Sequence, residues 1–317
     1  MRRPASPRPA RARGVTSLSA LAAAVLLLTA CGAERAGAGR PGADGSEPPS
    51  RTQIDDPGKD GVRITSLTLP SASPSPARGS VSADGLPGDS GVTAAYEITN
   101  EAAEALTYSV VVTFVSGDGG AVTNRTVTVR DVGPGKTVRG TVRAGELPPA
   151  APRVVRAKVL TVAKVPADEA VAEPGTCPAS GIRVSADKGD AAMGLRVVGL
   201  HLDNCGTRDY TVEGYPLLEL LDDKLEPVEG VEILDGSREI TTGAGEDKEP
   251  GRVTLRPGES ATSSLVWRNT TEFGTPVNVP HVRVRAKTGA DPVTLTVHLD
   301  LGTTGKLGVK TWEKAER

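Results

Sequence analysis

Two neighbouring stretches decide the fold of this chain: VTAAYEITN at residues 92–100 and LTYSVVVTF at residues 106–114. In both, apolar and polar residues alternate, which places one kind of side chain on each face of an extended strand. Gly-Asp-Gly-Gly at 117–120 then predicts a turn, and further valine-rich alternating segments continue to residue 165 without a helical stripe. Short strands separated by turns predict a β-sandwich of immunoglobulin-like architecture over residues 61–165.

The same alternation returns after an acidic, proline-containing segment at residues 166–176, which predicts a linker. Eight strand candidates follow, at residues 182–185, 195–202, 210–212, 217–221, 253–255, 261–267, 282–286 and 293–299. Two local patterns are common to both halves: a strand that closes on Asn (Asn100 and Asn204), and a Pro-Gly pair that opens a new strand (Pro134 and Pro257). We therefore expect an all-β chain with a second β-sandwich over residues 177–316.

The segment at residues 1–30 has the organisation of an export signal rather than of a folded element. Five arginines and no acidic residue precede an apolar run that ends in Leu28-Thr29-Ala30-Cys31. This quartet resembles the lipobox of bacterial lipoproteins. The resemblance implies that Cys31 is diacylated on sulfur, becomes the mature N-terminus and holds the protein on the outer face of the cell membrane. Residues 31–60 contain almost no large apolar side chain, so they predict a flexible tether.

Lipidation of Cys31 would leave two cysteines, Cys177 and Cys205. Outside the cytoplasm, two remaining cysteines are expected to form a disulfide. Two buried free thiols are one alternative. A two-cysteine metal site is another, although no histidine lies at ligand spacing from either residue.

Composition narrows the classes of partner. Without residues 1–30 the chain holds 32 Lys and Arg against 39 Asp and Glu, and this acidic balance argues against nucleic acid and against a polybasic membrane patch. Only eight residues are aromatic, so platforms for stacking sugars or bases are scarce. No motif for a cofactor is present, and we expect none to be bound.

The second half also carries a family resemblance. The motifs are Cys177, the strand that ends in Asn204-Cys205, Gly214-Tyr215-Pro216, the turn at 255–260 and Leu265-Val266-Trp267. Together they resemble an uncharacterised domain family that is common in secreted actinobacterial lipoproteins. The resemblance implies a β-sandwich and a surface location, and it supplies no activity or ligand.

Residues with chemical potential do not form a recognisable catalytic motif. Ser185-Ala-Asp-Lys188 and Lys287-Thr-Gly289 superficially match two motifs of penicillin-recognising serine enzymes, but they lack the helical context and the third motif. His201, His281 and His298 stand singly in strand patterns and are expected to be structural. Two acidic groups, at residues 222–229 and 246–249, have no calcium-loop spacing and are interpreted as charged turns, the second within a mobile loop at 235–251.

These features together predict a membrane-anchored, non-enzymatic extracytoplasmic lipoprotein that binds or positions another envelope component, a protein or a polymer. Cys31 would be its lipid-modified residue, with Cys177 and Cys205 as its disulfide and no catalytic or metal site. Two alternatives stay open: a solute-binding component of a transporter and an enzyme with an unrecognised site.

Overall fold

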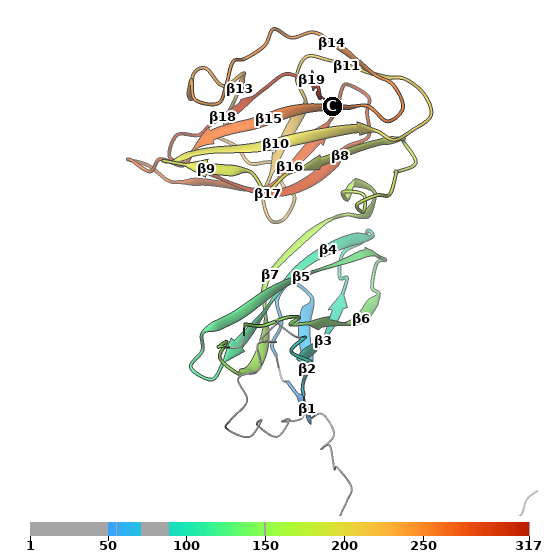
Figure 1. Cartoon of the computed structure of the whole chain (residues 1–317), viewed down its shortest axis with the longest axis vertical. Coiled ribbons are helices and arrows are strands. Elements are labelled where there is room, and N and C mark those ends of the chain that lie inside the picture. The colour runs from blue at the N-terminus through green and yellow to red at the C-terminus, as the bar shows by residue number, and fades with distance from the viewer. Residues whose placement is uncertain (1–49, 55, 71–88, 149, 317) are drawn as a thin grey trace, which may run out of the picture. The chain divides into compact units, whose positions relative to one another are not determined.

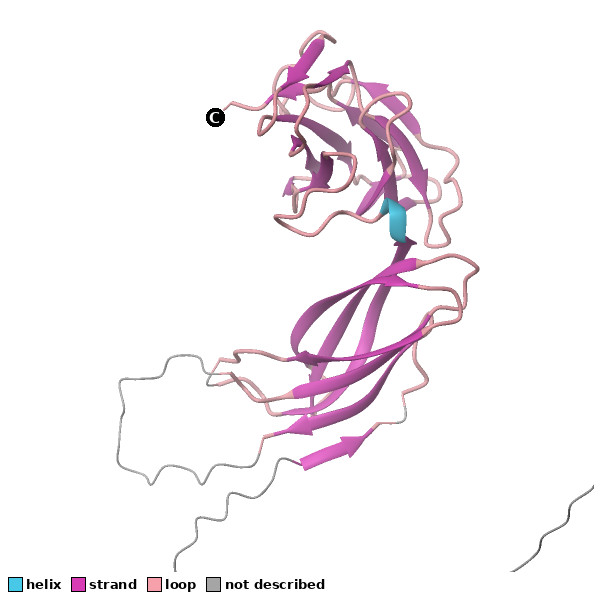
Figure 2. Ribbon diagram, turned by 90° about the vertical axis from the view of Figure 1, so that its right-hand side faces the viewer, coloured by secondary structure: helices cyan, strands magenta, loops and turns pink. Residues whose placement is uncertain are grey.

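The computed structural model describes residues 50–54, 56–70, 89–148 and 150–316. Within these residues the chain forms nineteen β-strands and one 3-10 helix of three residues, η1 (Ala167–Glu169), which is the single cyan turn in Figure 2. The expected all-β class is therefore confirmed at the level of secondary structure.

The N-terminal strand group, residues 50–166, contains two antiparallel sheets. Its strands are β1 (Ser50–Gln53), β2 (Val62–Leu69), β3 (Thr93–Thr99), β4 (Leu106–Ser116), β5 (Ala121–Val132), β6 (Thr137–Arg143) and β7 (Val154–Pro166). One sheet has the order β1-β2-β3-β6 and the other the order β5-β4-β7 (Figure 1). The alternation in the sequence explains the core, because Tyr108, Val110 and Phe114 all point from β4 into one buried cluster with Ile64 and Ile98.

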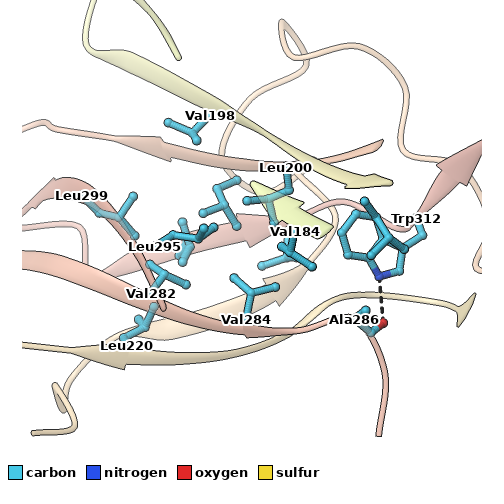
Figure 3. Close-up of a cluster of buried hydrophobic side chains, with 14 of the residues drawn as sticks. Val184, Val198, Leu200, Leu220, Val282, Val284, Ala286, Leu295, Leu299 and Trp312 are labelled. Atoms are coloured by element: carbon cyan, nitrogen blue, oxygen red, sulfur yellow. Dashed lines mark hydrogen bonds between the residues drawn. The ribbon is translucent and has the colours of Figure 1, made fainter. Parts of the chain in front are cut away.

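The C-terminal strand group, residues 182–314, is built around three sheets. Its strands are β8 (Ile182–Ala186), β9 (Asp190–Ala192), β10 (Leu195–Asn204), β11 (Tyr210–Glu213), β12 (Leu217–Leu221), β13 (Glu232–Asp235), β14 (Arg252–Leu255), β15 (Ser260–Arg268), β16 (Val277–Arg285), β17 (Val293–Gly302), β18 (Lys306–Val309) and β19 (Glu313–Lys314). The largest sheet has the order β13-β18-β15-β10-β8, and β12-β16-β17 and β11-β14 form the others. They enclose a second buried cluster, of which Figure 3 shows Val184, Leu200, Val282 and Trp312.

A buried asparagine closes a strand in each group with the same set of hydrogen bonds. In the N-terminal group, Asn100 Nδ2 donates to the carbonyls of Glu104 and Val132, both at 2.7 Å, and Asn100 Oδ1 accepts from the Ala102 amide at 2.9 Å. The Asn100 backbone carbonyl accepts from the amide of Gly135, the glycine of the Pro-Gly turn, at 2.8 Å.

Asn204 reproduces this arrangement in the C-terminal group. Its Nδ2 donates to Arg208 and Leu255 carbonyls at 2.8 and 2.9 Å, and its Oδ1 accepts from the Gly206 amide at 3.2 Å. Its backbone carbonyl accepts from Gly258 at 2.7 Å. The repeated Asn and Pro-Gly patterns in the sequence therefore correspond to one repeated structural motif.

We expect Asn204→Ala to lower the free energy of unfolding by roughly 2–4 kcal/mol, because it leaves buried backbone groups without their hydrogen-bond partner. Urea unfolding followed by circular dichroism measures this change. Asn278→Ala, at an exposed position of β16, is the matched control and should change stability by less than about 0.5 kcal/mol. Equal effects of the two substitutions would contradict the role assigned to Asn204.

Two segments that the sequence predicts to be irregular contain ordered residues. The predicted tether contains β1, which pairs with β2 from Ser50↔Leu69 to Gln53↔Ser66. All four β1 side chains are exposed, so the pairing buries no apolar side chain and leaves no apolar alternation in the sequence. Residues 1–49, which include the predicted signal segment and most of the predicted tether, lie outside the described residues.

The predicted linker is also ordered at its start. Glu169 of η1 accepts hydrogen bonds from Arg283 Nε at 2.8 Å and from Thr294 Oγ1 at 2.5 Å, and Ala170 forms a parallel bridge with Thr294. Arg283 also donates to Glu219 at 2.8 Å. These contacts hold residues 169–170 against the sheet β12-β16-β17. The composition of residues 166–176 does not predict this attachment, because it indicates a linker.

Candidate functional site

Three turns meet at one end of the C-terminal strand group: the β9–β10 turn, the β15–β16 loop and the β17–β18 turn. They meet because residues 195–203 of β10 pair with β15, so that Leu195 lies opposite Arg268. Figure 1 shows β9 beside the first half of β10. The Asn269 amide donates to the Gly194 carbonyl at 3.0 Å, and the Thr303 amide donates to the Thr270 carbonyl at 2.9 Å. We call these turns, residues 190–194, 269–276 and 302–305, the loop end.

A carboxylate at the base of the loop end fixes the loops. Asp300 accepts from Trp267 Nε1 at 2.9 Å and from Asn269 Nδ2 at 3.0 Å, and Arg196 lies 3.4 Å from the same group. Burial raises the pKa of Asp300, but the hydrogen bonds from Trp267 and Asn269 and the charge of Arg196 outweigh it and hold that pKa below its usual value. The carboxylate is therefore ionised at neutral pH and keeps its partners in place.

Gly302 makes the close approach of two loops possible. Its φ is +57°, and a Cβ at this position would lie 2.2 Å from the Thr270 carbonyl oxygen. A side chain would therefore separate the β17–β18 turn from the β15–β16 loop. The loop end is accordingly a preorganised surface rather than a set of independent loops.

The loop end presents two large apolar side chains to solvent. Met193 is 99% exposed and Phe273 is 100% exposed. The chain has only two phenylalanines and two methionines, and the other phenylalanine, Phe114, is fully buried. Exposed Phe and Met on fixed loops are typical of recognition surfaces, where these residue types are enriched.

Two of the three cysteines lie within the described residues. Cys177 and Cys205 form a disulfide with a Cα–Cα distance of 5.7 Å, so the expected pair is present. A disulfide indicates an oxidising, extracytoplasmic environment. Cys31 lies outside the described residues. Among the residues that the structure describes, no helix has the length and apolar character needed to cross a membrane.

The catalytic resemblance of Ser185 and Lys287 has no counterpart in the structure. Ser185 stands opposite His201 in the β8–β10 ladder. Lys287 donates to the Thr211 carbonyl at 2.8 Å, and its Nζ lies 4.1 Å from the centre of the Tyr210 ring. The lysine is thus bound to β11, away from any partnership with the serine.

The three histidines occupy different environments. His201 is half-exposed, with Nε2 3.7 Å from Asp187. His281 is buried, its Nδ1 lies 3.2 Å from Thr296 Oγ1, and burial lowers its pKa. His298 has a φ of +48° beside a register shift opposite Pro280, the position where β16 lacks an amide for the ladder. Each histidine therefore has its own structural environment, as the sequence predicts for residues that stand singly in strands.

Acidic residues have local structural partners. Asp222 Oδ1 accepts from the amides of Lys224 and Glu226 at 2.8 and 2.9 Å, as expected for a charged turn. In the described part of the chain, no cluster of three or more His, Cys, Asp or Glu side chains is arranged to hold a metal ion.

The expected mobile loop at 235–251 is instead folded around Asp247. Its carboxylate accepts from the Ser237 amide and hydroxyl, both at 2.9 Å, and Lys310 Nζ lies 3.8 Å away. Lys310 also donates to the carbonyls of Ala244, Gly245 and Glu246. Lys310 is distant in sequence from this segment, so composition alone does not reveal the contact.

This loop predicts an acid-sensitive contribution to stability. Burial raises the pKa of Asp247, but the hydrogen bonds from Ser237 and the charge of Lys310 outweigh it and lower that pKa overall. The stabilisation should be complete above the unfolded-state pKa of about 3.9 and should be lost as pH falls through the lower folded-state value. The urea midpoints of wild type and Asp247→Asn should therefore differ most at neutral pH and converge in acid, and a pH-independent difference would contradict this assignment.

The fold and the loop end define an extracytoplasmic all-β protein with a fixed loop surface. Residues 177–313 match the family described as "Domain of unknown function (DUF4232)". An uncharacterised domain therefore lies where the motifs around Cys177, Gly214 and Trp267 place one. Comparisons with curated proteins and with solved structures found no match.

No pattern in the sequence reveals the loop end. Phe273 and Met193 are 80 positions apart in the sequence, and each stands alone among small or polar neighbours. The pairing of β10 with β15 brings their loops to the same end of the C-terminal strand group. The scarcity of Phe and Met in the chain is the signal that would have drawn attention to them.

Proposed function

We propose that the chain is a membrane-anchored extracytoplasmic lipoprotein with a non-enzymatic role, in which the loop end binds or positions another component of the cell envelope. Cys31 is the lipid-modified residue in this proposal. The lipobox-like sequence at 28–31 supports the anchor, and the Cys177–Cys205 disulfide supports the location. We further propose that the two strand groups are immunoglobulin-like sandwiches in tandem, with recognition through loops at the end of the second.

The observation that carries the binding role is the full exposure of Phe273 and Met193 on loops that the Asp300 network fixes. Exposed apolar side chains gain free energy when a partner removes them from water, about 1.5–3 kcal/mol for each side chain fully buried. Fixed loops lose little conformational freedom on binding, so more of this gain is retained as affinity.

A photo-crosslinking amino acid at position 273 of the full chain, expressed in its native cells, tests the binding role. We expect a discrete crosslinked product whose partner mass spectrometry identifies. The same amino acid at Leu217, a similarly apolar residue that is 44% exposed on β12, is the control. Equal, diffuse labelling from both positions, or no product at 273, would overturn the recognition role of the loop end.

The anchor makes a separate prediction. The processed chain should fractionate with membranes, because two acyl chains contribute about 0.8 kcal/mol per buried methylene and hold far better than one. Cys31→Ser should leave an unprocessed or released form, which immunoblotting of membrane and soluble fractions detects. If the Cys31→Ser variant stayed on the membrane and were cut at the same position, the lipid anchor would be wrong.

A further inference from the structure

The strand β7 carries a second exposed apolar surface, far from the loop end in sequence. Val155 and Leu160 are 46% and 43% exposed. Each is the extra residue of a register shift: Val115 pairs with Arg156 and Ser116 with Val154, while Val111 pairs with Thr161 and Val112 with Val159. The bulged residues are left out of the β4–β7 ladder, which explains why aliphatic side chains of a strand remain in solvent.

Basic residues lie near these two residues along the strand. Arg153, Arg156 and Lys158 stand beside them in the sequence, and none of the three has an acidic partner within 4 Å among the described residues. In the described sheets β7 pairs with β4 alone. We call Val155, Leu160 and these three cations the β7 edge.

The loop end has the opposite charge. Glu272 stands next to Phe273, whereas Asp190 stands at the start of β9, opposite Val197 and three residues before Met193. Neither carboxylate has a cationic partner within 4 Å among the residues that the structure describes. Arg196, the basic residue close by, is engaged with Asp300. The loop end therefore combines apolar side chains with uncompensated negative charge.

We propose that the loop end of one copy of this chain binds the β7 edge of a second copy. The two surfaces hold four of the six large hydrophobic side chains that are exposed in the described residues. Their charges are complementary, negative on the loop end and positive on the β7 edge, which favours this pairing over two like surfaces. The inference rests on the proposed recognition role of the loop end and names its partner.

The geometry of such a contact has a consequence for assembly. The two surfaces differ, so the contact is head-to-tail, and each bound pair of copies leaves one loop end and one β7 edge free. The association therefore repeats, into a ring or a chain of copies. A small contact of this kind is weak in solution, and copies held on one membrane would meet at a high effective concentration.

Paired cysteine substitutions in the full chain test the contact. Two differently tagged copies are expressed in the same cells, one with Phe273→Cys and one with Leu160→Cys, and treated with a short bismaleimide. We expect a crosslinked product that carries both tags. Leu217→Cys replaces Leu160→Cys in the control pair, because Leu217 is exposed to the same extent as Leu160.

Charge reversal supplies the second arm. Glu272→Lys in the Phe273→Cys copy should lower the crosslinked yield several-fold, and Lys158→Glu in the partner copy should restore it. A yield equal to that of the Leu217 control would overturn the proposal, as would a dominant product between two Phe273→Cys copies. If photo-crosslinking at 273 gives a different protein and the cysteine pair gives nothing, the recognition role holds and the second copy is wrong as its partner.

Discussion

Replacing Trp312 by Ala should lower the free energy of unfolding of the C-terminal strand group by roughly 3–5 kcal/mol, the range for removing a large buried aromatic side chain. Trp312 is 1% exposed and packs in the cluster shown in Figure 3. Its Nε1 donates to the Ala286 carbonyl at 3.0 Å, and its amide donates to the Gly214 carbonyl at 2.8 Å. One residue near the end of the chain thus joins β16 to the break between β11 and β12.

The break explains why the loss should be large. β11 pairs with β14, and β12, which follows after Gly214-Tyr215-Pro216, pairs with β16. Thr311 Oγ1 also donates to the Gly214 carbonyl, at 2.8 Å. Removing the indole would therefore open a cavity next to the Gly214 carbonyl, which accepts its hydrogen bonds from Thr311 and Trp312.

Urea unfolding and differential scanning calorimetry measure the effect. Trp312→Phe is the matched variant: it retains most of the apolar volume and loses the hydrogen bond to Ala286, so its loss should be smaller, roughly 1–2 kcal/mol. A loss below about 1 kcal/mol for Trp312→Ala would show that the site collapses around the missing ring and that the segment after β18 does not hold the two sheets together.

The second large effect is expected from the disulfide. Cys177→Ala combined with Cys205→Ala should destabilise the C-terminal strand group by roughly 2–5 kcal/mol, because the bridge closes a 28-residue separation and limits the unfolded chain. It ties the segment before β8 to the residue after Asn204, so the double variant also frees the end of β10.

Thiol labelling gives an independent measurement of the bridge. A denatured, unreduced chain that carries Cys31→Ser should contain no reactive thiol, and reduction should expose two. Two reactive thiols before reduction would contradict the disulfide. Asn100→Ala should shift the urea midpoint by the same amount in the wild-type background and in the Cys177→Ala, Cys205→Ala background. The two effects should be independent because the hydrogen bonds of Asn100 involve neither cysteine.

The sequence predicts those parts of the fold in which buried and exposed side chains alternate or turn residues mark the ends of strands. Val110, Val112 and Phe114 lie on one alternating face, and Pro257-Gly258 marks a turn, so β4 and β15 are predicted close to their observed bounds. β13 is different, because it pairs in parallel with β18 through residues that are mostly exposed. Such a strand has no buried face and leaves no alternation to detect.

The candidate site is less predictable than the fold for a related reason. The disulfide follows from counting cysteines. The loop end instead depends on contacts between segments that are distant in the sequence, such as the hydrogen bonds that Trp267 and Asn269 donate to the Asp300 carboxylate. Composition also conceals the β7 edge, since a chain with a net negative charge outside residues 1–30 still has Arg153, Arg156 and Lys158 together at the start of β7. The limits of the two domains and the lipid anchor stay predictions.

The asparagine motif indicates where this architecture tolerates added length. The Asn side chain reaches a carbonyl 32 residues later in the N-terminal group and 51 residues later in the C-terminal group, with the same hydrogen bonds at both sites. The intervening connections can therefore grow without disturbing the strand ends they join, as expected from the slow rise of loop-closure entropy with length. In engineering terms, the exposed connection between β12 and β13, outside the segment that Asp247 and Lys310 hold, is a permissive insertion site for a foreign peptide or an entire guest domain.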